Sequence, residues 1–430
     1  MANEFEYRKL QRARVTYLAT VVLLVFTGLF ARLWYLQVAM GDELLKQSNA
    51  NWDKLIRTRA PRGGILYRDG EVLATSRPQF VVMAIPERLR ESDQAVRTLC
   101  DILNITPDDL EYAVKKSEAR PGSPARIAVD VPLETVARIG ELRMLLPGVS
   151  VELDQIRYYP DGPAVAHLVG SLGEINQEEL DTAKESGLDY RPGDYVGKSG
   201  LEKQYEHLLR GSDGGKKIKV NAFGRVVKIL GEEPSVPGKT LTLAIDRDLQ
   251  IAGYRAMGDR AGAVVALNPQ TGEVLAMVSK PDYDPNAFVK RISRRDWEKM
   301  LRRHALQNRC VYNPYPPGST FKPIVAVAGL KYGACNVKTT AVCPGSFHLG
   351  RFRFGCWKTH GRVDFTQAIA QSCDVWFYNM ARRLGIERMA KVARQFGIGS
   401  KTGIDLPREA AGIMPDPEWK KQVRDEPWYP

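Results

Sequence analysis

A long uncharged run near the amino terminus limits what the first part of this chain can fold into. The run extends from Val15 to Ala31 and is rich in Leu, Val and Phe. Arg32 interrupts it, but the apolar face continues to Leu36. A helix from Val15 to Leu36 rises roughly 30 Å, which is enough to cross a bilayer. We therefore predict a transmembrane anchor at residues 15–38; the alternative is a buried helix of a soluble protein.

Basic residues precede this run, at Arg8, Lys9, Arg12 and Arg14. A basic flank stays in the cytoplasm, so we expect residues 1–14 to form a cytoplasmic tail and the chain after Tyr35 to lie outside. No small-residue cleavage site follows the run, which favours an uncleaved anchor over a removed signal peptide.

The composition describes a folded protein. Of the 430 residues, 44% are hydrophobic and 26% are charged, and this length allows two or three domains. The net charge of +12 suits an anionic surface, but no nucleic-acid-binding motif accompanies it, so we expect no nucleic-acid partner. Gly197-Lys198-Ser199 is not a phosphate-binding loop, because Pro192 stands where such a loop needs glycine.

Turn and linker signals divide the remaining chain into two domains. Arg68-Asp69-Gly70-Glu71 is a hairpin signal between two strands, and residues 89–116 have a helical pattern. Mixed strands and helices continue to a Pro- and Gly-containing linker at residues 232–238. We predict a mixed α+β domain at residues 39–238, without an obvious catalytic cluster.

The second domain, residues 239–430, begins with strand patterns. Residues 240–246 alternate in polarity, and a helix with Leu249 and Ile251 follows. Residues 262–267 and 274–278 then predict a hairpin of two buried strands. We therefore expect the α/β (α+β) fold class, with an antiparallel sheet covered by helices.

The candidate catalytic residues of this domain lie at and after Ser319. The apolar run from Ile324 to Leu330 predicts a buried helix that starts at Ser319, after Pro317 and Gly318. Residues three apart on a helix are neighbours, so the Ser319 hydroxyl and the Lys322 amine should share one face. A buried neutral amine can remove the proton of a serine and make it a nucleophile. The alternative is an ordinary helix cap with an exposed lysine, because the S-x-x-K spacing alone is common.

Several separate motifs, in the same order, resemble the class B penicillin-binding proteins, and in particular their elongation-type subfamily. The resemblance covers nearly the whole chain and rests on these stretches: the anchor, Arg62-Gly63, Tyr158-Tyr159-Pro160, Gly200-Leu201-Glu202, Asn268-Pro269-Gln270-Thr271-Gly272, Pro317-Gly318-Ser319-Thr320-Phe321-Lys322 and Gly403-Ile404-Asp405-Leu406-Pro407. It implies an N-terminal transmembrane helix, a pedestal (dimerisation-type) domain and a penicillin-binding transpeptidase domain.

The resemblance also implies a function, that of a serine D,D-transpeptidase that cross-links peptidoglycan during cell elongation and rod-shape maintenance. Ser319 would attack a stem peptide ending in D-Ala-D-Ala and form an acyl-enzyme, with Lys322 as the base and the Ser319 N–H as one oxyanion donor. Beta-lactams would acylate the same serine. Implied partners are a membrane glycosyltransferase and other elongation-complex proteins, and the implied location is the bacterial inner membrane with the main body in the periplasm.

Ser372-Cys373-Asp374 stands where the family has its second motif, S-x-N. The resemblance implies that Ser372 passes protons between Lys322 and the leaving or attacking amine. Asp374 replaces the usual Asn, as in the elongation-type subfamily. Its carboxylate can accept a hydrogen bond from Lys322 but donates only when protonated.

The third family motif, K-T/S-G, is expected farther along than Lys401-Thr402-Gly403, which falls in a turn. We interpret Lys401 as unrelated to that motif, and we expect the transpeptidase domain to be incomplete at residue 430. A second class of function therefore stays open, a non-catalytic truncated scaffold whose pedestal activates a glycosyltransferase. A beta-lactam sensor is not expected, because residues 1–14 leave no room for a signalling portion.

Four of the side chains that can bind a metal lie close together beside these motifs: Cys343, Cys356, His360 and Cys373. Three thiolates and one imidazole can form a closed tetrahedral zinc shell. The family resemblance implies a structural zinc here, with Asp, Asp, His and Cys at these four positions. The competing interpretation is a Cys343–Cys356 disulfide. His348 is the alternative imidazole, and we do not choose it.

Overall fold

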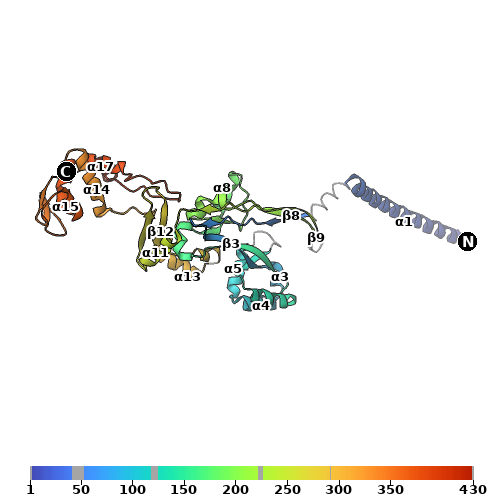
Figure 1. Ribbon diagram of the computed structural model, residues 1–430. Coiled ribbons are helices and arrows are strands. Elements are labelled where there is room, and N and C mark those ends of the chain that lie inside the picture. Colours follow the sequence, from blue (N-terminus) through green and yellow to red (C-terminus); the bar gives the residue numbers. More distant parts are fainter. Residues whose placement is uncertain (1, 41–52, 118–123, 221–225, 291, 429–430) are drawn as a thin grey trace. The chain divides into compact units, whose positions relative to one another are not determined.

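The computed structural model describes residues 2–40, 53–117, 124–220, 226–290 and 292–428 (Figure 1). The chain divides into two compact units, which are Met1–Arg62 with Arg210–Gly238, and Gly63–Leu209 with Lys239–Pro430. The domain limits expected from the sequence, 39–238 and 239–430, stay predictions.

The first unit contains the apolar helix. Helix α1 spans Ala2–Trp34 and continues as a π-helical turn, η1, over Tyr35–Ala39. Within it, Thr20–Ala39 is long and apolar enough to cross a membrane, and none of that stretch is buried. This finding agrees with the predicted anchor, while its orientation stays a prediction.

A three-stranded antiparallel sheet, in the order β1-β8-β9, completes the first unit. Its strands are β1 (Asp53–Thr58), β8 (Gly214–Val220) and β9 (Val226–Glu233). The predicted linker at 232–238 is partly wrong, because its first two residues lie in β9. There Glu232 forms an ion pair of 2.9 Å with Lys216 of β8, and Val236 forms an isolated bridge with Ser212. Pairing partners in β8 therefore extend the strand into residues that look like a linker.

The first part of the second unit is built on a mixed sheet, in the order β10-β2-β3-β4 with β5 also paired to β3. Its strands are β2 (Ile65–Leu66), β3 (Val72–Ala84), β4 (Ala125–Val129), β5 (Val149–Tyr158) and β10 (Leu241–Thr242). The predicted hairpin is confirmed: β2 and β3 are antiparallel, and Gly70 at the turn has φ 89°, which glycine adopts without a steric penalty. The strand expected at residues 240–246 is shorter than its pattern, since only β10 pairs.

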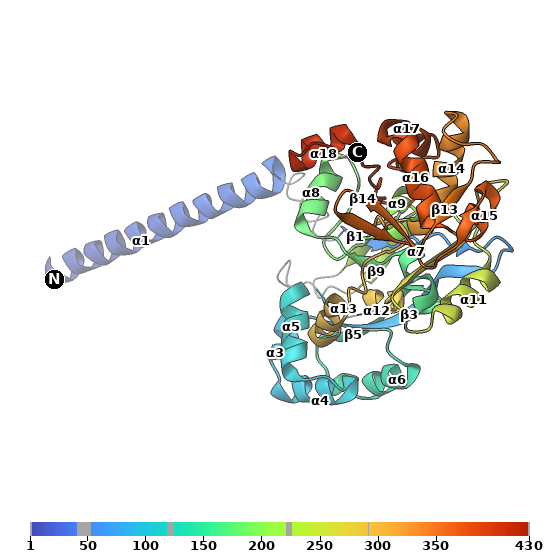
Figure 2. The ribbon, with the colours of Figure 1, turned by 90° about the vertical axis from the view of Figure 1, so that its left-hand side faces the viewer.

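Helices α3 to α6 pack beside this sheet, with side chains such as Leu89, Leu99, Leu110 and Ile127 in one core (Figures 1 and 2). Their bounds are Pro86–Arg90, Asp93–Leu103, Pro107–Ser117 and Leu133–Glu141. The helical pattern expected over 89–116 is thus confirmed as three helices. Thr106 caps α5, because its hydroxyl accepts the Asp109 N–H at 3.2 Å.

Three of the motifs that carry the family resemblance meet at one buried ion pair. Arg157 Nε donates to Glu202 Oε1 at 2.7 Å, with both side chains at most 1% exposed. The Tyr159 hydroxyl donates to the same carboxylate at 3.1 Å, and Arg157 also donates to the Gly63 carbonyl at 2.6 Å. A buried ion pair needs such additional hydrogen bonds to offset desolvation. These motifs therefore serve the architecture of this region.

Short α-helices and strands follow β5 along the chain. They are α7 (Ala166–Val169), β6 (Leu172–Glu174), α8 (Gln177–Glu185), β7 (Tyr195–Gly197), α9 (Gly200–Gln204) and α10 (Glu206–Leu209). Gly170, which ends α7, and Gly200, which begins α9, lie back to back. A Cβ on Gly200 would lie 2.4 Å from the Gly170 nitrogen. Only glycine fits at such an approach.

The next part of the chain contains helix α11 (Arg247–Met257) and the antiparallel hairpin β11 (Gly262–Leu267) and β12 (Val274–Lys280). The hairpin is confirmed, but the prediction of two buried strands is wrong for β11. Val265 is 47% and Leu267 is 58% exposed. The buried Gln250 of α11 binds β12 instead, since its side-chain amide donates to Met277 O and accepts from Met277 N, at 2.9 and 2.7 Å.

The last part is mainly helical. It contains α12 (Pro285–Val289), α13 (Arg294–Arg302), α14 (Lys322–Lys331), α15 (Phe365–Ala370), α16 (Asp374–Leu384), α17 (Ile386–Gln395) and α18 (Pro417–Arg424). Two hairpins accompany them: β13 (Ala341–Cys343) with β16 (Gly361–Val363), and β14 (Ser346–Leu349) with β15 (Phe352–Gly355). Helices α14, α16 and α17 pack on one another (Figure 2), with Val325, Trp376 and Met380 in the shared core.

Candidate active site

Ser319 lies in a tight turn, and the α-helix that follows begins at Lys322. The turn is a 3-10 helix over Gly318–Phe321, in which the Thr320 hydroxyl donates to the Pro317 carbonyl at 2.6 Å. The sequence predicted a buried α-helix starting at Ser319 itself. The helix is confirmed, but it starts three residues later, and its Val327 and Leu330 side chains are 41% and 42% exposed. This geometry leaves Ser319 exposed and Lys322 partly buried.

A continuous chain of hydrogen bonds joins the four side chains expected at the site. Lys322 Nζ donates to the Ser372 carbonyl at 2.8 Å, to Ser372 Oγ at 2.8 Å and to Asp374 Oδ1 at 2.6 Å. Ser372 Oγ donates onward to Ser319 Oγ at 3.0 Å. An ammonium group has three N–H donors, so all three are used. Ser372 therefore lies between the Ser319 hydroxyl and the Lys322 amine.

Charge at the site is balanced locally. Lys322 and Asp374 form an ion pair, with side chains 13% and 26% exposed. The ammonium also lies 5.7 Å from the centre of the Phe377 ring, and the face of an aromatic ring attracts a cation. The carboxylate of Asp374 thus fixes the position of the Lys322 amine, and Phe377 is a neighbour that the sequence motifs did not reveal.

The backbone of Ser372 has the left-handed conformation, with φ 51°. A serine rarely adopts this region, because the Cβ crowds the backbone. The turn is held where α15 ends, since the Ser372 N–H donates to Ile369 O at 3.1 Å and the Cys373 N–H to Ala368 O at 2.9 Å. This conformation aims Ser372 at Lys322. The residue types of the S-x-D pattern do not predict this left-handed conformation, so the sequence alone could not reveal it.

The four candidate metal ligands come together as expected. The donor atoms of Cys343, Cys356, His360 and Cys373 all lie within 4.8 Å of one another. His360 Nδ1 lies 3.5 Å from both the Cys343 and the Cys356 sulfur. All six cysteines of the chain are free thiols in this structure, so the Cys343–Cys356 disulfide is not formed in it.

The chemistry of this cluster fits a divalent metal ion. Burial would raise the pKa of the Cys343 thiol, but hydrogen bonds from the backbone and the imidazole of His360 outweigh it and lower that pKa to about 7. Burial raises the pKa of Cys373 to about 12, so this thiol would lose its proton only on binding the metal. Thiolates are the form that binds zinc. His348, the alternative imidazole ligand, is exposed and lies opposite Arg353 in the β14–β15 hairpin.

Lys401 lies in an irregular loop and not on a strand. The loop is held by Glu409, whose carboxylate accepts from the Thr402 hydroxyl at 2.5 Å and from the Gly403 N–H at 3.1 Å. The expectation that Lys401 is unrelated to a cleft strand agrees with this geometry.

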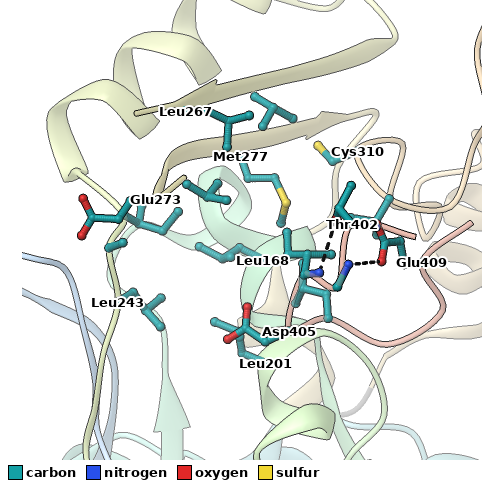
Figure 3. Close-up of a pocket in the computed structure, with 18 of the residues that line it drawn as sticks. Leu168, Leu201, Leu243, Leu267, Glu273, Met277, Cys310, Thr402, Asp405 and Glu409 are labelled. Carbon is teal, nitrogen blue, oxygen red and sulfur yellow. Dashed lines mark hydrogen bonds between the residues drawn. The ribbon is translucent and has the colours of Figure 1, made fainter. Parts of the chain in front are cut away.

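The same loop borders a cavity of about 810 Å³. Figure 3 shows Leu168, Leu201, Met277 and Cys310 around it, with Asp405 at its side. Neither Ser319 nor Lys322 lines it. The cavity is therefore separate from the hydrogen-bonded side chains of the candidate active site.

Comparison with known proteins agrees with this site. Residues 57–243 match the Penicillin-binding Protein dimerisation domain, and residues 262–425 match the Penicillin binding protein transpeptidase domain. The second match contains Ser319 and Lys322 together with the second serine, Ser372. The chain therefore belongs to the penicillin-binding protein family.

Within this family the chain is similar to MrdA proteins, also called PBP2. It is 35% identical to the peptidoglycan D,D-transpeptidase MrdA of Acinetobacter baumannii over 98% of this chain and 63% of that protein. It is 36% identical to MrdA of Escherichia coli K12, over 97% of this chain and 67% of that protein. The chain thus spans about two thirds of the length of these relatives. A solved complex of PBP2 with MreC from Helicobacter pylori superposes with a TM-score of 0.77 at 29% identity, covering 88% of this chain and 72% of that one.

Proposed function

We propose that this protein is a peptidoglycan D,D-transpeptidase that acts through an acyl-enzyme on Ser319. Ser319 Oγ forms a bond to the carbonyl carbon of the penultimate D-Ala of a stem peptide. The bond from that carbon to the terminal D-Ala nitrogen then breaks. The amine nitrogen of a second stem peptide then forms a bond to the same carbonyl carbon, the ester bond to Ser319 Oγ breaks, and a proton of the amine passes to Ser319 Oγ, which completes the cross-link.

Proton transfer uses the atoms that these hydrogen bonds join, in the reverse of the donor direction in the structure, where Lys322 donates to Ser372 and Ser372 donates to Ser319. The proton of Ser319 passes through Ser372 Oγ to Lys322, which acts from its neutral form, and Lys322 returns it to the leaving D-Ala amine. Asp374 keeps the amine in place through both steps. The Ser319 N–H, in the first turn of a helix where N–H groups lack intrahelical partners, serves as one oxyanion donor.

The observation that carries this proposal is the hydrogen bond of 3.0 Å between Ser372 and Ser319, with Lys322 2.8 Å behind it. The test is the intact mass of the protein before and after penicillin. One penicillin adduct on the wild type and none on Ser319→Ala supports it. No adduct on the wild type overturns it and favours the scaffold, since a non-catalytic protein needs no acylation.

We further propose that Cys343, Cys356, His360 and Cys373 hold a structural zinc ion. Support comes from the four donor atoms, which lie within 4.8 Å of one another. Zinc would supply structural cross-linking and no reaction step. Because Cys373 lies between Ser372 and Asp374, the ion would hold the second catalytic motif to the β13–β16 region. Native mass spectrometry tests this: one zinc lost on denaturation supports it, and a loss of two hydrogens without metal overturns it.

We propose that the anchor places the main body on the outer side of the bacterial inner membrane, with residues 1–14 inside. Support comes from the basic residues before the apolar stretch. We also propose that the protein works with elongation-complex proteins, including a membrane glycosyltransferase. The Helicobacter pylori PBP2 that resembles this chain was solved with MreC. Protease protection of a tag at either end of the chain tests the orientation.

A further inference from the structure

Trp357 connects the candidate metal loop to the turn that carries Ser372. It follows the candidate ligand Cys356, and its ring lies edge-on to His360 with centroids 5.2 Å apart. Its indole N–H donates to the Gln371 carbonyl at 3.0 Å. Gln371 is the C-cap of α15 and the residue directly before Ser372. The side chain is nevertheless 64% exposed, so burial of apolar area is not its main contribution.

The carbonyl of Gln371 needs a partner because of where it lies. The last carbonyls of a helix have no intrahelical donor, and the left-handed Ser372 turns the chain away from the helix. The peptide unit between Gln371 and Ser372 is thus oriented by the indole on its carbonyl side and by the Ile369 carbonyl on its N–H side. The next carbonyl, that of Ser372, accepts from Lys322.

We propose that Trp357 is a positioning residue for acyl transfer, whose indole N–H holds the left-handed turn at Ser372 so that its hydroxyl stays between Ser319 and Lys322. This inference rests on the proposed function of the same site. The candidate metal loop, residues 343–360, would then position Trp357, and Trp357 would in turn position Ser372. Trp357 itself touches no reacting atom.

The test uses Trp357→Phe in the whole chain, since Phe keeps an aromatic ring and loses the N–H donor. Trp297→Phe is the matched control, because Trp297 is also partly exposed, at 41%, and packs on Phe288. The first measurement is hydrogen exchange of the Ser372 and Cys373 amides, which donate inside the turn. We expect about threefold to tenfold faster exchange in Trp357→Phe, as for the loss of one hydrogen bond, and no change in the control.

The second measurement is acylation by penicillin, separated into noncovalent affinity and the rate constant of bond formation. Trp357→Phe should lower the rate constant about threefold to tenfold and leave the affinity and the zinc content unchanged. In a Ser372→Ala background the same change should have almost no effect, since the positioned hydroxyl is gone. A purely structural tryptophan would cost the same factor in both backgrounds.

The inference is wrong if the Ser372 and Cys373 amides of Trp357→Phe exchange at the wild-type rate. It is also wrong if Trp357→Phe lowers the acylation rate constant equally with and without the Ser372 hydroxyl. A wild type that takes no penicillin contradicts the proposed function instead. In that case the exchange measurement, which needs no reaction, still decides whether Trp357 holds the turn.

Discussion

Ser372 contributes both its hydroxyl group and an unusual backbone conformation, and two different substitutions can separate these contributions. Its hydroxyl links Ser319 to Lys322, and its backbone has φ 51°. An alanine would lose the hydroxyl and keep the unfavourable conformation, whereas a glycine would lose both. Backbone strain at Ser372 therefore accompanies the placement of its hydroxyl between Ser319 and Lys322.

We expect Ser372→Ala to lower the rate of acylation by about 100-fold, the low end of the usual contribution of a positioned proton carrier. Ser372→Gly should be slowed at least as much, yet should be about 1 kcal/mol more stable than Ser372→Ala because glycine tolerates positive φ. Fluorescent penicillin labelling measures the rate, and urea unfolding measures the stability. Ser372→Ala at wild-type rate would remove Ser372 from the mechanism.

At the residue scale, the sequence predicted which side chains form the site better than how they are held. The S-x-x-K spacing led to Ser319 and Lys322, and the family resemblance led to Ser372 and Asp374; the structure brings all four together. The patterns could not reveal the left-handed turn or the Trp357 contact, because neither depends on a residue type within the motif. Such contacts between distant segments arise only from tertiary packing.

At the scale of elements, one carboxylate joins three segments. Asp130, after β4, accepts from Arg77 of β3 at 2.8 Å and from Lys290, the C-cap of α12, at 2.7 Å. The hydrogen bond from Arg77, with Lys290 adding to it, lowers the pKa of Asp130 to about 2. A lowered pKa means that the contribution to stability is present above the unfolded-state value, near pH 4, and is lost as the pH falls to about 2.

We expect Asp130→Asn to be less stable than the wild type by about 1 kcal/mol at pH 7, with a difference that shrinks steadily as the pH falls from about 4 to about 2. Asn is a suitable substitute because it also tolerates φ 55°, the value at this position. Thermal unfolding of both proteins between pH 7 and pH 2 measures the difference. A gap that stays constant over this range would show that the charge of Asp130 plays no part.

The back-to-back glycines of α7 and α9 give a second prediction at this scale. We expect Gly200→Ala to lower the free energy of unfolding by about 3 kcal/mol or more, because the new Cβ would lie 2.4 to 2.6 Å from backbone atoms. Gly333→Ala is the control: its φ is also positive, at 67°, but the space around it is open, so it should lose only about 1 kcal/mol. Equal losses in chemical denaturation would mean that the close approach costs nothing.

Element types were easier to predict than their burial. The helices after residue 89, the β2–β3 hairpin and the β11–β12 hairpin follow from local patterns. The exposure of β11 does not, because Val265 and Leu267 have the same apolar character as the buried residues of β12. Likewise the extension of β9 into residues 232 and 233 depends on its partner β8, which lies earlier in the sequence.

At the scale of the whole molecule, the chain combines an apolar helix with a folded body. We expect the full chain to stay in the membrane pellet after an alkaline wash, and a chain starting at Asp53 to be released. The reason is the 20-residue apolar stretch Thr20–Ala39, whose burial in lipid is far more favourable than surface adsorption. Membrane retention of the shorter chain would show that another surface binds the membrane.

The pairing of β1 with β8 has a consequence for the order of events during synthesis. The strands are antiparallel partners, with Asp53 opposite Lys219, and all of Gly63–Leu209 lies between them in the chain. A ribosome makes β1 long before β8 exists. Until then β1 is an unpaired strand edge, a template for wrong partners. Any defect that slows the folding of Gly63–Leu209 therefore prolongs this interval, and aggregation of nascent chains would reveal it before any loss of finished activity.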